Sequence, residues 1–159
     1  MNDGKPVRPI RRDELRKFKH VVVVFGSRNY KDEEIFDACV TGFIRDHHLT
    51  KENTVFVSGM AVTGADAMIV EWCKRNGWRW HECPADWDNI DVPGARIKIN
   101  SAGKKYNALA GFNRNQEMAN VSSHGLGFWD FQSPGTGDMV ERVRDKKLIL
   151  RLIRVKVEG

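Results

Sequence analysis

The chain has 159 residues, of which 41% are hydrophobic and 30% charged, and its net charge is 26 − 21 = +5. These values predict one soluble globular domain and exclude a disordered chain, and no apolar run approaches the roughly 18–20 residues that cross a membrane. A polar, basic N-terminus argues against a secretory signal, and three cysteines without CxxC spacing argue against a disulfide framework or a zinc site, so we expect a cytoplasmic protein without a metal.

Basic residues crowd both ends of the chain. We predict that residues 1–19 form a basic arm, either poorly ordered or as a short lead-in helix, and that residues 20–159 form a single domain. Such ends can contact nucleic acid or another anionic surface, or can simply be solvated. Because no nucleic-acid-binding motif accompanies them, nucleic acid is the less favoured partner.

From residue 20 onward, strand-like and helix-like segments alternate, which is typical of βαβ units. Strands are predicted at 21–25, 55–57, 78–83, 125–131 and 153–157, with helices at about 32–44, 65–76, 111–122 and 135–146. The first two strands are unbroken apolar runs, as expected in the centre of a sheet, whereas the third and fifth alternate, as expected at its margins. These features predict an α/β, Rossmann-like three-layer sandwich. Its mostly parallel five-stranded sheet has the order 3-2-1-4-5.

The stretch from Asp88 to Ala110 is long for a link between a strand and a helix. It contains Pro93, Gly94, Gly103 and three lysines. Long connections of this kind are usually functional or disordered. We therefore expect either a lid over the rim of a ligand pocket or a disordered insertion.

Several loops that follow the predicted strands meet at the carboxyl edge of the sheet, where ligands bind in open α/β folds. Gly26 lets backbone N–H groups approach an anion, with Ser27 beside it, and Arg28 could add a forked contact to phosphate. The loop Ser58-Gly59 to Gly64-Ala65-Asp66 resembles a phosphate-binding loop in outline, but it is neither a Walker A motif nor GxGxxG. Asp66 could bind a ribose hydroxyl, act as a general base or simply favour the helix dipole.

The remaining loops supply further candidates. Trp87 could stack on a base or be a core or lid residue, and Asp86 could bind ligand hydroxyls or cap a turn. Arg114 and Asn115 lie near the start of the third helix, where an arginine opposes the helix dipole unless an anion or Asp66 offsets it. Before the fourth helix, hydroxyls and free N–H groups could bind an anion, or could form an ordinary helix start: Ser133, Gly135 and Thr136.

The series GSRNY, SGMAVTGAD, PADWD, AGFNRNQEM and SPGTG, in this order over residues 20–150, resembles the YspA/cpYpsA-related SLOG family, part of the superfamily of DprA (SMF) and LOG proteins. The resemblance implies a Rossmann-like domain that binds nucleotides or nucleotide derivatives, with NAD- or ADP-ribose-like ligands expected. Residues 89–102 stand out as an insertion. Carried onto matching positions, the pocket comprises Gly26, Ser27, Arg28, Gly59, Gly64, Asp66, Asp86, Trp87, Arg114, Asn115, Ser133, Gly135 and Thr136.

The main hypothesis is a nucleotide-binding sensor, sequestering protein or restricted enzyme. An alternative is a nucleotide N-glycosidase with Asp66 or Asp86 as the catalytic carboxylate. Aligned with the LOG motif PGGxGTxxE, however, the chain has Met139 where the catalytic glutamate belongs. A second alternative is single-stranded nucleic-acid binding, as in DprA, and the sequence leaves open whether the chain forms a homo-oligomer.

Overall fold

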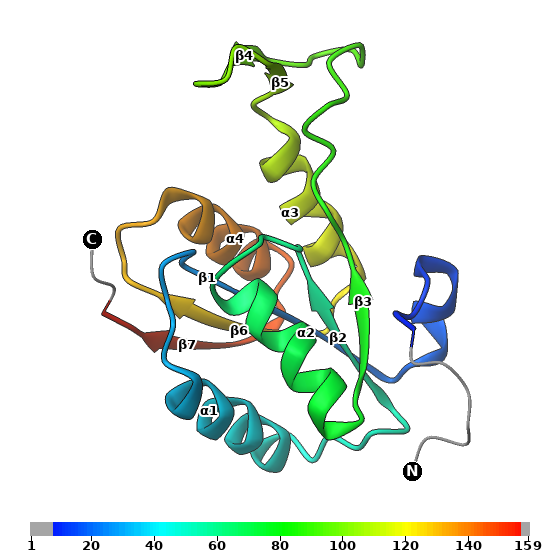
Figure 1. The fold of residues 1–159 in the computed structure, drawn as a ribbon. Helices are drawn as coiled ribbons and strands as arrows, with labels where there is room; N and C mark the ends of the chain where they lie inside the picture. Colours follow the sequence, from blue (N-terminus) through cyan, green and yellow to red (C-terminus); the bar gives the residue numbers. More distant parts are fainter. Residues whose placement is uncertain (1–7, 157–159) are drawn as a thin grey trace.

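The computed structural model describes residues 8–156, which form a central parallel sheet with helices on both faces (Figure 1). The sheet order is β3-β2-β1-β6-β7, and every neighbouring pair is parallel. The predicted α/β, Rossmann-like fold and its strand order are therefore confirmed. The bounds of the sheet strands and helices are β1 His20–Gly26, α1 Glu33–Asp46, β2 Thr54–Ser58, α2 Ala65–Asn76, β3 Arg79–Glu82, α3 Ala110–Val121, β6 His124–Trp129, α4 Pro134–Asp145 and β7 Ile149–Arg154.

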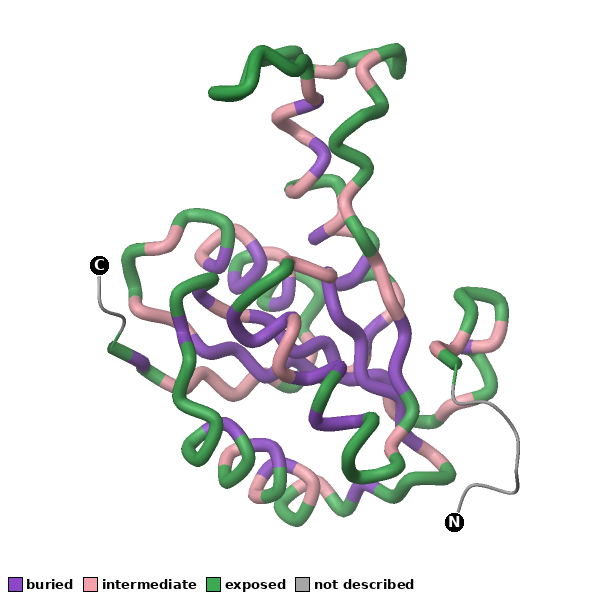
Figure 2. Tube along the Cα trace, viewed as in Figure 1, coloured by how far each residue is buried: buried purple, intermediate pink, exposed green. Residues whose placement is uncertain are grey.

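The central strands pack against two separate cores, because successive strand side chains point to opposite faces. Val22 and Val24 belong to the core under α1 and α2, whereas Val21 and Val23 belong to the core under α3 and α4. All four valines are buried, and the buried trace runs through the middle of the sheet in Figure 2. The unbroken valine run thus produces the three layers, with the loops at the carboxyl edge left to form a site.

The strand bounds differ from the sequence prediction by one residue at each end of the first three strands, and by more in the last two. The last strand is Ile149–Arg154, not 153–157, because its register with β6 runs from His124 to Trp129, and the pairing ends with the Val155 N–H that donates to the Trp129 carbonyl at 3.0 Å. Residue 157 of the predicted strand lies outside the described residues. The third strand covers 79–82, not 78–83, and β6 covers 124–129, not 125–131, since the chain turns away at Asp130.

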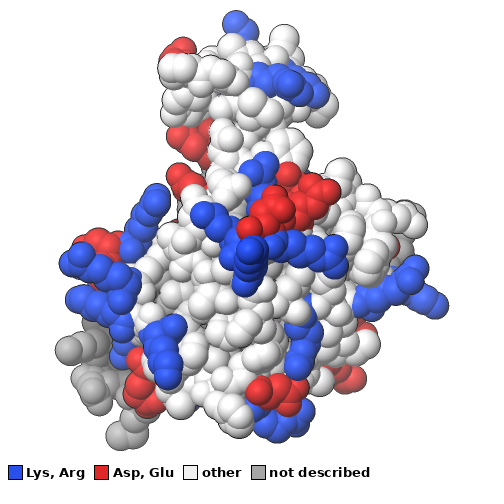
Figure 3. Space-filling view, turned by 180° about the vertical axis from the view of Figure 1, so that it is seen from behind, with Lys and Arg blue, Asp and Glu red and all other residues white. Residues whose placement is uncertain are grey.

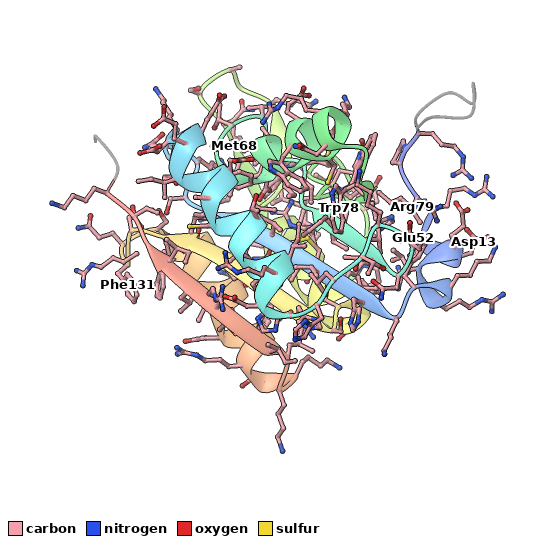
Figure 4. The ribbon with its side chains drawn as sticks, turned by 90° about the horizontal axis from the view of Figure 1, so that it is seen from below. Asp13, Glu52, Met68, Trp78, Arg79 and Phe131 are labelled. Carbon is pink, nitrogen blue, oxygen red and sulfur yellow. The ribbon has the colours of Figure 1, made fainter. Side chains whose placement is uncertain are left out.

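The part of the basic arm that the structure describes contains a short 3₁₀-helix, Arg12–Lys17, and docks beside β3. Ile10 donates its N–H to the Trp80 carbonyl at 2.6 Å, and its own carbonyl contacts His81 Nδ1 at 2.7 Å. Leu15 is buried in the core under α3 and α4. Asp13 and Arg79 lie on one side of the molecule and Phe131 on the other (Figure 4). The lead-in helix is thus present, and residues 1–7 of the arm lie outside the described part.

The long link after β3 folds into a small antiparallel hairpin of β4 Ile97–Ile99 and β5 Lys105–Asn107. It projects away from the sheet beyond the start of α3, and its trace is largely exposed (Figures 1 and 2). The sequence predicted a lid or a disordered insertion for the stretch from Asp88 to Ala110, and the structure has a short hairpin there, with none of residues 88–107 lining the cavity described below. Its short strands escaped prediction because each has only three residues.

Candidate functional site

A cavity of about 490 Å³ opens at the carboxyl edge of the sheet. Its walls come from the end of β1, the starts of α2, α3 and α4, and the loop after β3, so segments far apart in sequence converge on one crevice. The predicted site residues that line it are Gly26, Arg28, Asp66, Trp87, Arg114, Asn115, Ser133, Gly135 and Thr136.

Four other predicted residues lie behind the cavity wall and shape it. Ser27 is buried, and its Oγ accepts hydrogen bonds from the Asp130 N–H at 3.3 Å and the Ser133 hydroxyl at 3.1 Å. Ser58 donates its hydroxyl to the Asp66 carbonyl at 2.8 Å and accepts the Met60 N–H at 3.1 Å. Together with Gly59 and Gly64, these serines join the loops, so their part is structural rather than direct contact with the cavity.

Gly64 is the closest contact between the first two loops. It has φ +75°, and a Cβ there would lie 2.5 Å from the Ser27 carbonyl oxygen. Any L side chain would therefore meet both backbone strain and a clash with main-chain atoms. Glycine at this position therefore lets the start of α2 lie directly against the backbone of Ser27 and Arg28.

Asp86 is not part of the cavity. It is exposed in the loop after β3, and its carbonyl accepts the Asn89 N–H at 3.2 Å. The neighbouring Trp87 does line the cavity, so the turn at Pro84–Trp87 presents the ring and not the carboxylate. The hypothesis that Asp86 is a catalytic or ribose-binding carboxylate is therefore not supported by its position.

Asp66 and Arg114 form the charged floor of the cavity. Asp66 is buried and its Oδ2 accepts the Ala61 N–H at 3.1 Å. A Cβ atom added to Gly59 would lie 2.7 Å from Arg114 Nη1 and 3.0 Å from Asp66 Oδ2. The guanidinium and the carboxylate therefore both lie next to Gly59. Arg114 Nη1 also donates to the Gly59 carbonyl. The guanidinium of Arg114 is thereby held by a backbone carbonyl group and not by an exposed acidic side chain.

Burial acts on both of these charges. It raises the pKa of the Asp66 carboxyl, while the Ala61 N–H and the positive charges of Arg114 and Arg28 oppose that rise. Burial likewise lowers the pKa of the Arg114 guanidinium, which the Asp66 charge opposes. A carboxylate and a guanidinium with little access to water are costly to fold and well suited to hold a polar ligand.

Asn115 links the cavity to the back of the molecule. Its Nδ2 donates to the Gly135 carbonyl at 3.3 Å and to Asp138 Oδ2 at 3.1 Å, and Asp138 also accepts from Arg142 Nε at 2.7 Å. Seen from behind, acidic and basic side chains lie side by side below the projecting hairpin and do not form one basic face (Figure 3). Asp138 is therefore occupied by its neighbours, and Asn115 fixes α3 against the start of α4.

The helices around the cavity begin in an unusual way. Within residues 8–156, α1 is capped by Asp32, whose side chain accepts the Ile35 N–H at 3.1 Å, but no side chain caps α2, α3 or α4. The first turns of these three helices supply cavity residues, including Asp66, Phe112 and Gly135. Nothing stands within 4 Å of a Cβ built at Gly135, so the first turn of α4 is open to an incoming group. Free N–H groups at a helix start favour an anion there.

Sequence reasoning missed half of the lining. The additional residues are Phe25, Asn29, Ala61, Ala108, Gly111, Phe112, Met118, Pro134 and Met139. Most are apolar residues whose type carries no chemical signal. Phe112 is the exception, because it lies inside the AGFNRNQEM string and is 37% exposed despite its large apolar ring. Met139 is buried in the wall, so the position of the LOG glutamate holds a thioether and no carboxylate.

Two further properties bear on the kind of site. Among residues 8–156, no group of three or more His, Cys, Asp or Glu side chains is arranged to hold a metal ion. No helix in this part of the chain is both long and apolar enough to cross a bilayer.

Comparison with known proteins agrees with this architecture. Residues 20–89 match the model of the YspA, cpYpsA-related SLOG family. The predicted resemblance to this family is therefore confirmed over that segment, which carries the first three sheet strands and the turn at Trp87. None of the curated proteins compared with the chain matches it.

A solved structure is also similar in fold to most of the chain. DNA processing protein A (DprA) from Streptococcus pneumoniae superposes with a TM-score of 0.65 at 19% sequence identity. The match covers 92% of this chain and 54% of the DprA chain, so this protein spans about half the length of that neighbour. At this identity, the similarity shows a shared fold.

Proposed function

We propose that this protein binds a phosphorylated nucleotide derivative, such as ADP-ribose or NAD, in the cavity at the carboxyl edge. The proposal depends on one observation: two arginines, a buried carboxylate and an open helix start face a single cavity of about 490 Å³, a size that suits a small ligand. Arg28 and the first turn of α4 would hold phosphate. Asp66 would accept hydrogen bonds from ribose hydroxyls.

The charge balance of the cavity favours an anionic ligand. Arg28 and Arg114 outnumber Asp66 among its charged lining residues. Arg114 is committed to the Gly59 carbonyl and Asn115, whereas Arg28 is exposed and forms no ion pair with any residue of the described chain. Arg28 is therefore the cation that is free to turn toward a phosphate group.

Arg28→Gln is the most direct test. Removing a charge-assisted contact to phosphate should weaken ADP-ribose binding about tenfold or more, measured by isothermal titration calorimetry, with little change in the unfolding midpoint. Arg75→Gln is the matched control, because it removes the same charge from the last turn of α2, outside the cavity.

Wild-type protein at about 100 times the dissociation constant of its ligand should gain about 2.7 kcal/mol of stability. Failure of ADP-ribose, NAD and AMP to raise the melting temperature at millimolar concentration would contradict the proposal. Equal loss of affinity in both arginine variants would point to general electrostatic attraction.

A second candidate is hydrolysis of the N-glycosidic bond, which the burial of Asp66 favours. Burial raises the pKa of the Asp66 carboxyl, which makes its carboxylate a stronger proton acceptor than an exposed aspartate. The test is release of free adenine from AMP, followed by chromatography. Release that disappears in Asp66→Asn supports the enzyme, whereas binding without release supports a sensor or sequestering protein.

A further inference from the structure

We infer that Trp87, supported by the projecting hairpin, and the start of α3 form a base-binding subsite, so that the ligand carries an aromatic base and is not a sugar phosphate alone. This inference rests on the proposed function, since it concerns the same cavity. It assigns the cavity two halves: the phosphate and ribose half described above, and a base subsite whose rings are Trp87 and Phe112.

The two rings of the base subsite are available to a ligand. Trp87 is 36% exposed and Phe112 is 37% exposed, although both line the cavity. Every nucleobase has a flat π-face, and stacking on aromatic side chains is the usual way proteins hold it.

The hairpin contacts both the side chain and the backbone of Trp87. Tyr106 on β5 meets the Trp87 ring edge to face, with centroids 6.3 Å apart, and the Asn107 N–H donates to the Trp87 carbonyl at 2.7 Å. The Asn107 side chain in turn accepts the N–H groups of Arg96 at 3.2 Å and Leu109 at 3.0 Å. The hairpin is thereby fastened at its base to the residue that faces the cavity.

The start of α3 leaves space for the same ring. A Cβ at Gly111 would stand 2.9 Å from the far edge of the Trp87 ring, so glycine lets the indole lie directly against the helix. The chain enters the cavity wall at Trp87 and returns to it at Ala108, and no residue between them lines the cavity. The hairpin thus acts as a support behind the rings, and Tyr106 is a positioning residue that acts through Trp87.

AMP and ribose 5-phosphate separate the base from the rest of the ligand, because the two differ by the base alone. Wild-type protein should bind AMP about tenfold tighter than ribose 5-phosphate, measured by isothermal titration calorimetry. Phe112→Leu and Trp87→Leu should bring this ratio toward one while leaving ribose 5-phosphate binding unchanged. Phe131→Leu is the matched control, since it removes an exposed ring that does not line the cavity.

Two gentler variants test the supporting parts. Gly111→Ala should not weaken α3, because alanine favours a helix, yet its methyl group displaces the indole and should lower the ratio. Tyr106→Leu should lower the ratio and Tyr106→Phe should preserve it. A role of Tyr106 in folding alone would instead weaken both ligands equally.

The outcomes separate this inference from the proposed function. Equal affinity of wild-type protein for AMP and ribose 5-phosphate overturns the base subsite and leaves the phosphate half standing. Tighter AMP binding that persists in Phe112→Leu and Trp87→Leu also overturns it. If neither compound binds, both the subsite and the proposed function fail.

Discussion

The two edges of the sheet differ in the charge of their ionisable side chains. At the amino edge, His20 and His124 begin β1 and β6, and His47 follows α1. The His124 ring lies 5.4 Å from that of His20 and 5.3 Å from that of His47. Burial lowers the pKa of all three, that of His124 to about 4, so His124 is neutral at pH 7. At the carboxyl edge, by contrast, a buried carboxyl group, that of Asp66, lies near the half-buried guanidinium of Arg114.

This difference indicates that the carboxyl edge is built for binding, because its features lower the stability of the fold. The imidazoles of His47 and His124 pack against Phe43 as part of the core. The carboxyl edge instead keeps a buried acid and three helix starts that no described side chain caps. Such features cost free energy and gather where a ligand is held.

Among the variants that test this comparison, Gly64→Ala should lower the stability of the protein most. The variant forces a side chain into φ +75° and against the Ser27 carbonyl, and we expect it to lower the free energy of unfolding by about 3 kcal/mol. Chemical denaturation measures the loss. Gly135→Ala, with open space around its Cβ, should change stability by less than about 1 kcal/mol. Equal losses would mean that the close approach of the two loops is not what requires glycine.

Acid should act first on the amino edge. The folded-state pKa of His124 is about 4 against an ordinary 6.5, so the unfolded chain binds the proton more readily between these values. Stability from neutral His124 is therefore complete above pH 6.5 and is lost as the pH falls toward 4, by about 2 kcal/mol at pH 4.5.

The measurement compares free energies of unfolding at pH 7 and pH 4.5. His124→Gln should lose less stability on acidification than the wild type, whereas His48→Gln, at an exposed position, should behave as the wild type does. An unchanged acid response in His124→Gln would place the pH sensitivity elsewhere and remove the contrast between the edges.

Periodicity and strand composition predicted most of the fold, because the cause of each element is local. The apolar runs at 21–25 and 55–57 could only be central strands, and the alternating segments fell at the margins. The last strand was displaced because its position is set by pairing with β6, which no local pattern records. The β4–β5 hairpin was missed for a similar reason: it is held by Trp87 and Asn107 through contacts made in three dimensions.

The candidate site followed from topology more than from motifs. Loops after parallel strands must meet at one edge, and this placed Gly26, Arg28, Asp66, Arg114 and Gly135 at the cavity. The sequence could not tell a residue that lines the cavity from one that braces it, as with Ser27 and Ser58. Nor could it show that the turn at 84–87 turns Asp86 outward. These distinctions depend on side-chain direction, which the spacing of residues does not determine.

The smallest expected change in stability concerns the start of α1, which also lies at the carboxyl edge. Asp32→Ala removes the side-chain cap of α1 and should lower the free energy of unfolding by about 1 kcal/mol, while Asp32→Asn, which can still accept the Ile35 N–H, should lose much less. Because α1 begins outside the cavity, the rise in melting temperature on adding ADP-ribose should be the same in both variants as in the wild type. A smaller rise in Asp32→Ala would make the start of α1 part of the binding site. In that case α1, which Asp32 caps, could no longer be separated from the three helices whose uncapped first turns face the cavity.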